Sequence, residues 1–183
     1  QTEVNLKNRF NQSIGKGILD VVGLMGGKGQ SIIYCPKTDL AENWSLKFTE
    51  NNSNEIIDER ITDLIEFLEE EIHPKYYLIP CLKNGVAFHH GKLPDIVRKE
   101  IEDLFSLGII RNLFCTSTLL EGVNLPANNL FIVLPYKRTE NLSQFEFGNL
   151  IGRAGRIKDS LYGTVYCVER EDDEVWAEKY YEK

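Results

Sequence analysis

Residues 85–105 read GVAFHHGKLPDIVRKEIEDLF, and the fold can be worked out from this stretch. Its first four residues, Gly85–Phe88, form a short apolar run of the kind that is typical of a buried strand. Apolar residues then recur at the spacing of one helix face: Val97, Ile101, Leu104 and Phe105. Pro94 suits the first position of this helix, and Gly108 marks its end. A strand that leads through a polar loop into a helix is a repeating unit of α/β proteins.

The same alternation continues along the rest of the chain. Four more apolar, β-branched runs are expected to be buried strands: Ser31–Cys35, Arg111–Cys115, Leu130–Leu134 and Gly163–Val168. Most of them are separated by stretches with helical periodicity. We therefore predict an α/β fold with a doubly wound, mostly parallel sheet.

Three further helices are expected from their apolar stripes. The first stripe consists of Ile14, Ile18, Val22 and Met25, and the second of Ile57, Ile61, Ile65 and Leu68. Carboxylates cover the rest of the second helix, and we interpret them as a solvated face. The third helix starts with a capping box between Ser143 and Glu146. Its apolar face holds Phe147, Leu150, Ile151 and Ala154.

The chain has 183 residues, the size of one domain, and a formal net charge of −7. This charge excludes a protein that binds phosphates over its whole surface. The acidity is concentrated, because residues 55–71 and 169–182 hold 15 of the 28 acidic residues and only three basic ones. Outside these two segments basic residues are in excess, so a local nucleic-acid site is compatible with the composition.

Four scattered cysteines show neither the spacing of a zinc site nor a disulfide framework: Cys35, Cys81, Cys115 and Cys167. We therefore expect no metal site and a reducing, cytoplasmic setting. The longest apolar runs are far shorter than the ~20 residues of a membrane helix, and no basic and apolar leader precedes them. Because the chain begins at Gln1 rather than at a methionine, we interpret it as a processed product or a piece of a longer polypeptide.

Polar residues follow three of the predicted strands. They lie in Pro36–Thr38, in His89–Gly91 and in Thr116–Thr118. Because ligands bind outside the carboxyl ends of parallel strands, we expect these segments to share one edge and to offer donors to phosphate oxygens. Each segment alone is also explained by helix caps and turns, but all three together favour a binding edge.

Two arginines stand close together in Gly152-Arg153-Ala154-Gly155-Arg156. With Asn149 they occupy positions i, i+4 and i+7 of the last predicted helix, on the side opposite its apolar face. Planar guanidinium groups suit a bidentate grip on phosphate, although two arginines at this spacing are usually only surface charge.

Gly85–Pro94 followed by Arg98, then Cys115–Ala127, and then Asn149–Arg156 resemble motifs IVa, V and VI of the second RecA-like domain of superfamily 2 helicases. The branch is the superkiller-like one of the DEAD/DEAH-type ATP-dependent helicases, and Ser31–Cys35 is similar to its motif IV. The order and spacing of the motifs agree, and the resemblance covers residues 29–168. It implies a RecA-like, three-layer α/β/α domain of the P-loop NTPase type.

The resemblance also implies roles for the matching residues. Arg153 and Arg156 would reach across an interdomain cleft to the phosphates of ATP, with Arg156 as the arginine finger. Gly122, Asn124 and Asn149 would lie beside the nucleotide. The nucleic-acid strand would contact Lys37, Thr38, His90, Gly91, Thr116 and Ser117.

The sequence departs from the family at two places. Asn149 stands where most of the family has a glutamine, so its side chain is one methylene shorter. Gly91-Lys92 replaces Ala-Gly after the two histidines, which makes Lys92 either an extra phosphate contact or a solvated lysine.

Neither a G-x-x-x-x-G-K-[ST] phosphate loop nor a D-E-x-[DH] box is present. Gly26–Gln30 superficially resembles such a loop, but it precedes a strand and is predicted to be a turn. Glu69–His73 lies on an amphipathic helix rather than at a strand end. We therefore expect ATP and Mg²⁺ to be held mainly by a first RecA-like domain of the same polypeptide, and the isolated chain to be inactive.

The predicted organisation is an N-terminal helix within residues 1–28, a RecA-like domain over 29–168, and an acidic helix or tail over 169–183 that leads to a further domain. The predicted function is that of the C-terminal motor domain of an ATP-dependent helicase on single-stranded or duplex DNA or RNA, with no membrane partner. Two alternatives stay open. One is a non-hydrolysing nucleic-acid-binding or regulatory module, which Asn149 favours, and the other is a doubly wound enzyme that acts on a small nucleotide.

Overall fold

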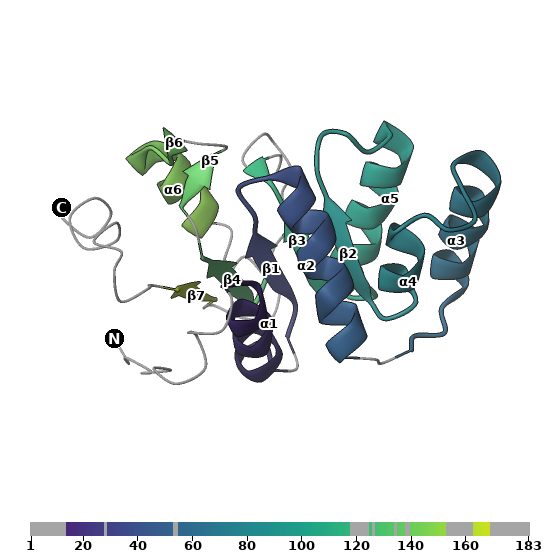
Figure 1. The fold of residues 1–183 in the computed structure, drawn as a ribbon, viewed down its shortest axis with the longest axis horizontal. Coiled ribbons are helices and arrows are strands. Elements are labelled where there is room, and N and C mark those ends of the chain that lie inside the picture. Colours follow the sequence, from purple (N-terminus) through teal and green to yellow (C-terminus); the bar gives the residue numbers. More distant parts are fainter. Residues whose placement is uncertain are drawn as a thin grey trace.

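The computed structural model describes residues 14–27, 29–52, 55–117, 125, 127–133, 135–137, 140–152 and 163–168. The first elements are α1 (Ile14–Met25), β1 (Ser31–Tyr34), α2 (Thr38–Asn51), α3 (Glu59–Glu71) and α4 (Leu78–Leu82). They are followed by β2 (Val86–His89), α5 (Asp95–Ser106), β3 (Asn112–Cys115) and β4 (Asn129–Ile132). The last are β5 (Tyr136–Lys137), β6 (Glu140–Asn141), α6 (Gln144–Ile151) and β7 (Thr164–Cys167), as Figure 1 shows.

The main sheet has five strands in the order β2-β3-β1-β4-β7, and every neighbouring pair is parallel. Ser31 at the start of β1 pairs with Asn112 of β3 on one side and with Asn129 of β4 on the other. Because the strands start in register and point the same way, their carboxyl ends meet at one edge of the sheet. The five predicted strands and the parallel α/β fold are confirmed.

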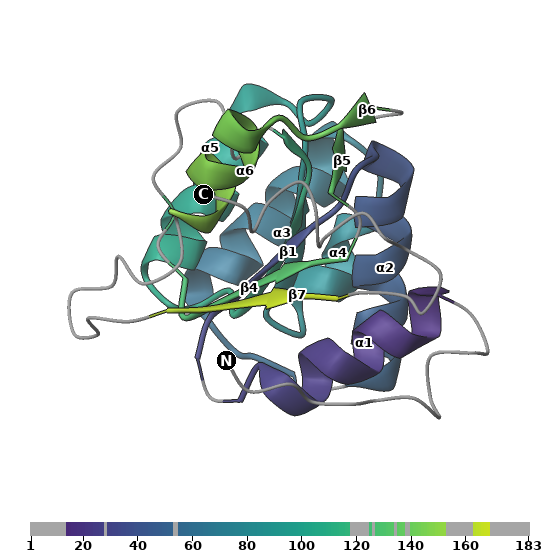
Figure 2. The ribbon, with the colours of Figure 1, turned by 90° about the vertical axis from the view of Figure 1, so that its left-hand side faces the viewer.

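Helices cover both faces of this sheet, which gives three layers. Figure 2 shows α1 and α2 on one face and α5 and α6 on the other. The helix α3 packs against α4 and α5 rather than on the strands, beyond the β2 edge of the sheet in Figure 1. Parallel strands between two helical layers are buried on both sides, which explains why they read as continuous apolar runs.

The predicted core of α5 is confirmed, because Val97, Ile101, Leu104 and Phe105 are completely buried. Its C-terminal signal is confirmed as well: the helix ends at Ser106, and Gly108 adopts the left-handed region with φ +78°. Pro94 is the N-cap rather than the first helical residue, since the helix begins at Asp95. This shift of one position follows from the extended ψ of 144° at Pro94.

The predicted stripe of α3 is wrong at Ile57. The side chain of Asp58 accepts a hydrogen bond from the amide of Arg60 at 3.0 Å and caps the helix, so Ile57 lies outside it and is 99% exposed. Ile61, Ile65 and Leu68 are buried as predicted. The three consecutive glutamates at residues 69–71 lie on this helix, as expected.

The capping box of α6 is present, with Ser143 and Glu146 each satisfying the other's backbone amide. Phe147 and Leu150 are buried as predicted, but Ile151 is 36% exposed, because it is the last helical residue before the cap at Gly152. The predicted apolar position Ala154 lies outside the described residues.

Two ends of the predicted organisation are only partly described. The helix α1 packs against α2, and Gly27, with φ +55°, forms a turn between α1 and β1. This confirms a turn rather than a phosphate loop at this place in the chain. Residues 1–13 and the acidic segment 169–183 lie outside the described residues.

Candidate nucleic-acid interface

The loops after β1, β2 and β3 lie side by side at the carboxyl edge of the sheet. Their strands are neighbours in the order β2-β3-β1. The backbone links them directly, because the amide of Thr116 donates to the carbonyl of His89 at 3.2 Å and the amide of Cys35 donates to that of Cys115 at 2.7 Å. The expectation that these three segments share one edge is therefore confirmed for the described residues, which end at Ser117 in the third loop.

Most of the residues that are predicted to contact a strand are accessible at this edge. Lys37 and Gly91 are exposed, and Thr38, Thr116 and Ser117 are half-buried. Lys37 is also the N-cap of α2, and its side chain does not cap the helix. The first amides of α2 therefore face the edge with the partial positive charge of a helix N-terminus, which favours an anion.

His90 behaves differently from its neighbours, because it is only 2% exposed. Its ring stacks on Phe88, with 5.4 Å between the ring centroids. The Nδ1 atom accepts a hydrogen bond from the amide of Lys92 at 3.3 Å, and Nε2 lies 3.0 Å from Oε1 of Glu42, within hydrogen-bond distance although not well directed. The ring is thus turned toward α2 rather than toward the edge.

His89 is completely buried on the other face of the sheet. Its Nε2 atom lies 2.8 Å from Oε1 of Glu102 on α5. Successive residues of a strand point to opposite faces, so the two histidines contact helices of opposite layers.

Burial sets the protonation of both histidines. It lowers the pKa of His89 below the usual 6.5, the carboxylate of Glu102 opposes this effect, and the nearby charge of Arg98 adds to it. Burial also lowers the pKa of His90, with Glu42 acting against the shift. Both rings are therefore neutral at pH 7, and the hydrogen of His90 is on Nε2, because its Nδ1 atom is an acceptor.

The predicted nucleotide side of the site is described at one residue. Asn149 is exposed on α6, a helix that Figures 1 and 2 place at the same end of the molecule as the three loops. Gly122, Asn124, Arg153 and Arg156 lie outside the described residues.

Sequence reasoning missed Glu42 and Glu102, the partners of the two histidines. Glu42 lies on α2, a helix that no clear apolar stripe announced. Glu102 is four residues after Arg98 on the predicted helix α5, where it reads as ordinary surface charge.

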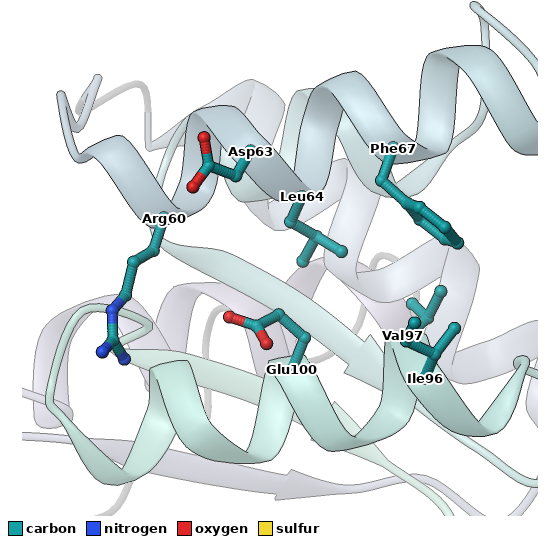
Figure 3. Close-up of a pocket in the computed structure, with 7 residues that line it drawn as sticks. All are labelled: Arg60, Asp63, Leu64, Phe67, Ile96, Val97 and Glu100. Atoms are coloured by element: carbon teal, nitrogen blue, oxygen red, sulfur yellow. The ribbon is translucent and has the colours of Figure 1, made fainter.

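A shallow groove of about 250 Å³ lies elsewhere, between α3 and α5 (Figure 3). It is lined by Arg60, Asp63, Leu64, Phe67, Ile96, Val97 and Glu100. None of these residues belongs to the three loops, so the groove is separate from the candidate site. Within the described parts of the chain, no group of three or more histidine, cysteine or acidic residues could hold a metal ion, and no helix is long and apolar enough to cross a membrane.

A parallel five-stranded sheet between two helical layers, with polar loops at its carboxyl edge, defines a doubly wound α/β domain. The chain belongs to the helicase conserved C-terminal domain family, whose model matches residues 61–158. This confirms the resemblance to the C-terminal domain of superfamily 2 helicases.

The curated relatives agree with this family. The chain is 35% identical over 105 residues to Anti-bacteriophage protein B of Escherichia coli K12, which covers 57% of this chain and 14% of that protein. It is 37% identical over 103 residues to ATP-dependent DNA helicase Hel308 of Methanocella arvoryzae, with 53% and 14% covered. Human Exosome RNA helicase MTR4 is 32% identical over 118 residues, with 61% and 11% covered. The two relatives named as helicases are consistent with the superkiller-like branch. The chain spans about a seventh of each of the three relatives or less.

Proposed function

We propose that this chain is the C-terminal motor domain of an ATP-dependent helicase that moves along single-stranded DNA or RNA. One observation supports the proposal most: a domain of this family brings three polar loops together at the carboxyl edge of adjacent strands. Relatives named as a DNA helicase and an RNA helicase are each similar to more than half of this chain.

In this proposal the strand lies across the carboxyl edge. The ammonium group of Lys37, the hydroxyl groups of Thr116 and Ser117, the N-terminus of α2 at Thr38 and the exposed backbone at Gly91 meet the phosphates and sugars. Backbone contacts of this kind hold a strand without reading its bases, as a translocating motor requires. His90 contributes through the position of its loop, because its ring faces α2.

ATP and Mg²⁺ are proposed to bind mainly to a first RecA-like domain of the same polypeptide. The γ-phosphoryl group of this ATP would be the group that is transferred to water. From this chain, Arg156 and Arg153 would stabilise the charge on that group, with Gly122, Asn124 and Asn149 beside the nucleotide. Asn149 is exposed and available for such a contact. Closing and opening of the two domains around ATP would drive the steps along the strand. The isolated chain is accordingly proposed to be inactive.

We also propose a cytoplasmic setting. Cys35 and Cys81 are buried thiols, and burial raises the pKa of both. Burial makes these two thiols unreactive, and the support for a reducing compartment is that neither forms a disulfide.

The test is ATP hydrolysis by the intact protein that contains this chain, with and without a single-stranded oligonucleotide. The Arg156→Ala variant should lose about 10³-fold or more of the hydrolysis rate, the effect of an arginine finger. Arg60→Ala, which removes an exposed arginine of α3, is the matched control and should keep the rate.

Two outcomes would contradict the proposal. If the intact protein binds the strand but hydrolyses no ATP, the non-hydrolysing module that Asn149 favours is correct instead. If the chain on its own hydrolyses ATP in response to a strand, its dependence on a partner domain is refuted.

A further inference from the structure

Strand β2 ends at His89, and His90 follows it directly; the rings of both histidines point into the protein. His89 is completely buried, and His90 is 2% exposed. The chain then turns outward at once, because Gly91 and Lys92 are exposed. The loop that the proposed function assigns to the strand therefore starts from two buried polar side chains.

Each ring is held by a carboxylate from a different helical layer. Glu42 of α2 lies 3.0 Å from Nε2 of His90, and Glu102 of α5 lies 2.8 Å from Nε2 of His89. Both carboxylates are partly accessible, with side-chain exposures of 33% and 24%. Carboxylates from both helical layers thus lie against the histidines at the end of β2.

The same two histidines set the backbone of the neighbouring loops. The carbonyl of His90 accepts a hydrogen bond from Leu93 at 3.1 Å, and its ring accepts one from the amide of Lys92. The carbonyl of His89 accepts the amide of Thr116 at 3.2 Å, which ties the loop after β2 to the loop after β3. The ring of His90 is therefore joined to the backbone of its own loop, and the backbone of His89 joins that loop to the one after β3.

We propose that Glu42 and Glu102 are positioning residues for nucleic-acid binding: through His90 and His89 they fix the loop at residues 90–92 in place beside Thr116. This inference rests on the proposed function. In this inference the two helical carboxylates contribute measurably to the affinity for nucleic acid without contacting it.

The experiment uses the intact protein and measures strand-stimulated ATP hydrolysis as a function of oligonucleotide concentration, with DNA and RNA of one sequence. Glu42→Gln and Glu102→Gln keep the side-chain shape and remove the charge. Each should raise the half-saturating oligonucleotide concentration about two- to tenfold, because a neutral amide attracts the imidazole N–H less strongly than a carboxylate does, while the maximal stimulated rate is retained. Matched controls on the same helices are Glu50→Gln and Asp103→Asn, which alter exposed carboxylates and should leave both values unchanged.

Two substitutions of His90 test whether the contact to Glu42 carries the effect. His90→Gln places an amide near the position of Nε2 and should stay within about twofold of the wild type. His90→Asn reaches only as far as Nδ1, so it keeps a partner for Lys92, loses Glu42 and should match Glu42→Gln. His90→Asn and Glu42→Gln disrupt the same contact. The double variant should therefore bind the oligonucleotide no more weakly than either single variant does.

Thermal unfolding of the same variants distinguishes a positioning role from a purely structural role. If Glu42→Gln and Glu102→Gln lower the melting temperature but bind the strand like the two controls, or if they change neither property, the inference is overturned. If the wild-type protein shows neither strand binding nor strand-stimulated hydrolysis, the proposed function itself fails, and this result comes from the wild type before any variant is compared.

Discussion

Gly85 directly precedes strand β2, which leads into the two histidines. Replacing Gly85 with alanine tests how tightly the residues at the start of this strand are packed. Its φ is +65°, in the left-handed region, and a Cβ atom there would lie 2.3 Å from Cδ1 of Ile56. Gly108 is a matched control, because its φ is +78° but nothing lies within 4 Å of an added Cβ. Gly108→Ala should therefore cost only the backbone strain, about 1–2 kcal/mol. Gly85→Ala should cost a similar strain plus about 1–1.5 kcal/mol of overpacking, the low end of the usual range, because Cδ1 is the far end of a flexible, half-buried side chain.

Ile56→Val removes Cδ1 and nothing else, so it isolates the overpacking at Gly85. Alone it should cost about 0.5–1 kcal/mol, because Ile56 is half-buried. Combined with Gly85→Ala it should restore at least about 1 kcal/mol relative to the sum of the single changes. Urea unfolding of the wild type, the three single variants and the double variant gives the free energies. The reasoning is refuted if Gly85→Ala is no more destabilising than Gly108→Ala, or if the effects of Gly85→Ala and Ile56→Val simply add.

Three further predictions concern the edge and the helix beside it. Lowering the pH from about 7.5 to about 5.5 should reduce the free energy of unfolding, because burial lowers the pKa of His90 in the folded state and the unfolded chain then binds more protons below about pH 6.5. Chemical unfolding across this range should show a smaller slope for His90→Gln than for the wild type, and equal slopes would contradict the prediction. Thr116→Ala should weaken the stimulation of ATP hydrolysis by added strand in the intact protein, whereas Thr116→Ser keeps the hydroxyl and the stimulation; equal stimulation in all three proteins would remove the strand contact. Ser143→Ala should cost about 1 kcal/mol of unfolding free energy through loss of the cap, Ser143→Asp should keep most of it, and equal stabilities would show that the capping box contributes nothing.

The strands were predictable because a parallel sheet buries them on both faces and leaves an unbroken apolar signal. The helix α2 was not predicted, because its buried face includes Ser45 and Thr49 beside Trp44 and Phe48. These hydroxyl groups donate to backbone carbonyls of their own helix, at 2.8 Å and 2.9 Å, so they can be buried without any apolar signal in the sequence. The error at Ile57 has the opposite cause, since an apolar residue at helical spacing lies just outside the cap.

At the candidate site, sequence reasoning brought the three loops together because strand polarity alone fixes that edge. Sequence reasoning could not predict the orientation of the His89 and His90 rings. That orientation depends on Glu42 and Glu102, and Glu42 lies 48 residues before His90 while Glu102 lies 13 residues after His89. The accessible lysine at position 92 and the buried His90 are two residues apart, and only the packing of α2 on β2 distinguishes them.

The strand order has a consequence for how this chain acquires its structure. Among the described strands, β1 pairs only with β3 and β4, and β2 pairs only with β3. No two strands of the main sheet can therefore pair until β3, which begins at residue 112, is available. Such long sequence separations slow folding, because a large loop must close before its contacts stabilise it. During synthesis, a nascent chain that has emerged only as far as residue 111 exposes two apolar strands without their partner. We therefore expect this domain to depend most on chaperones before residue 112 has emerged.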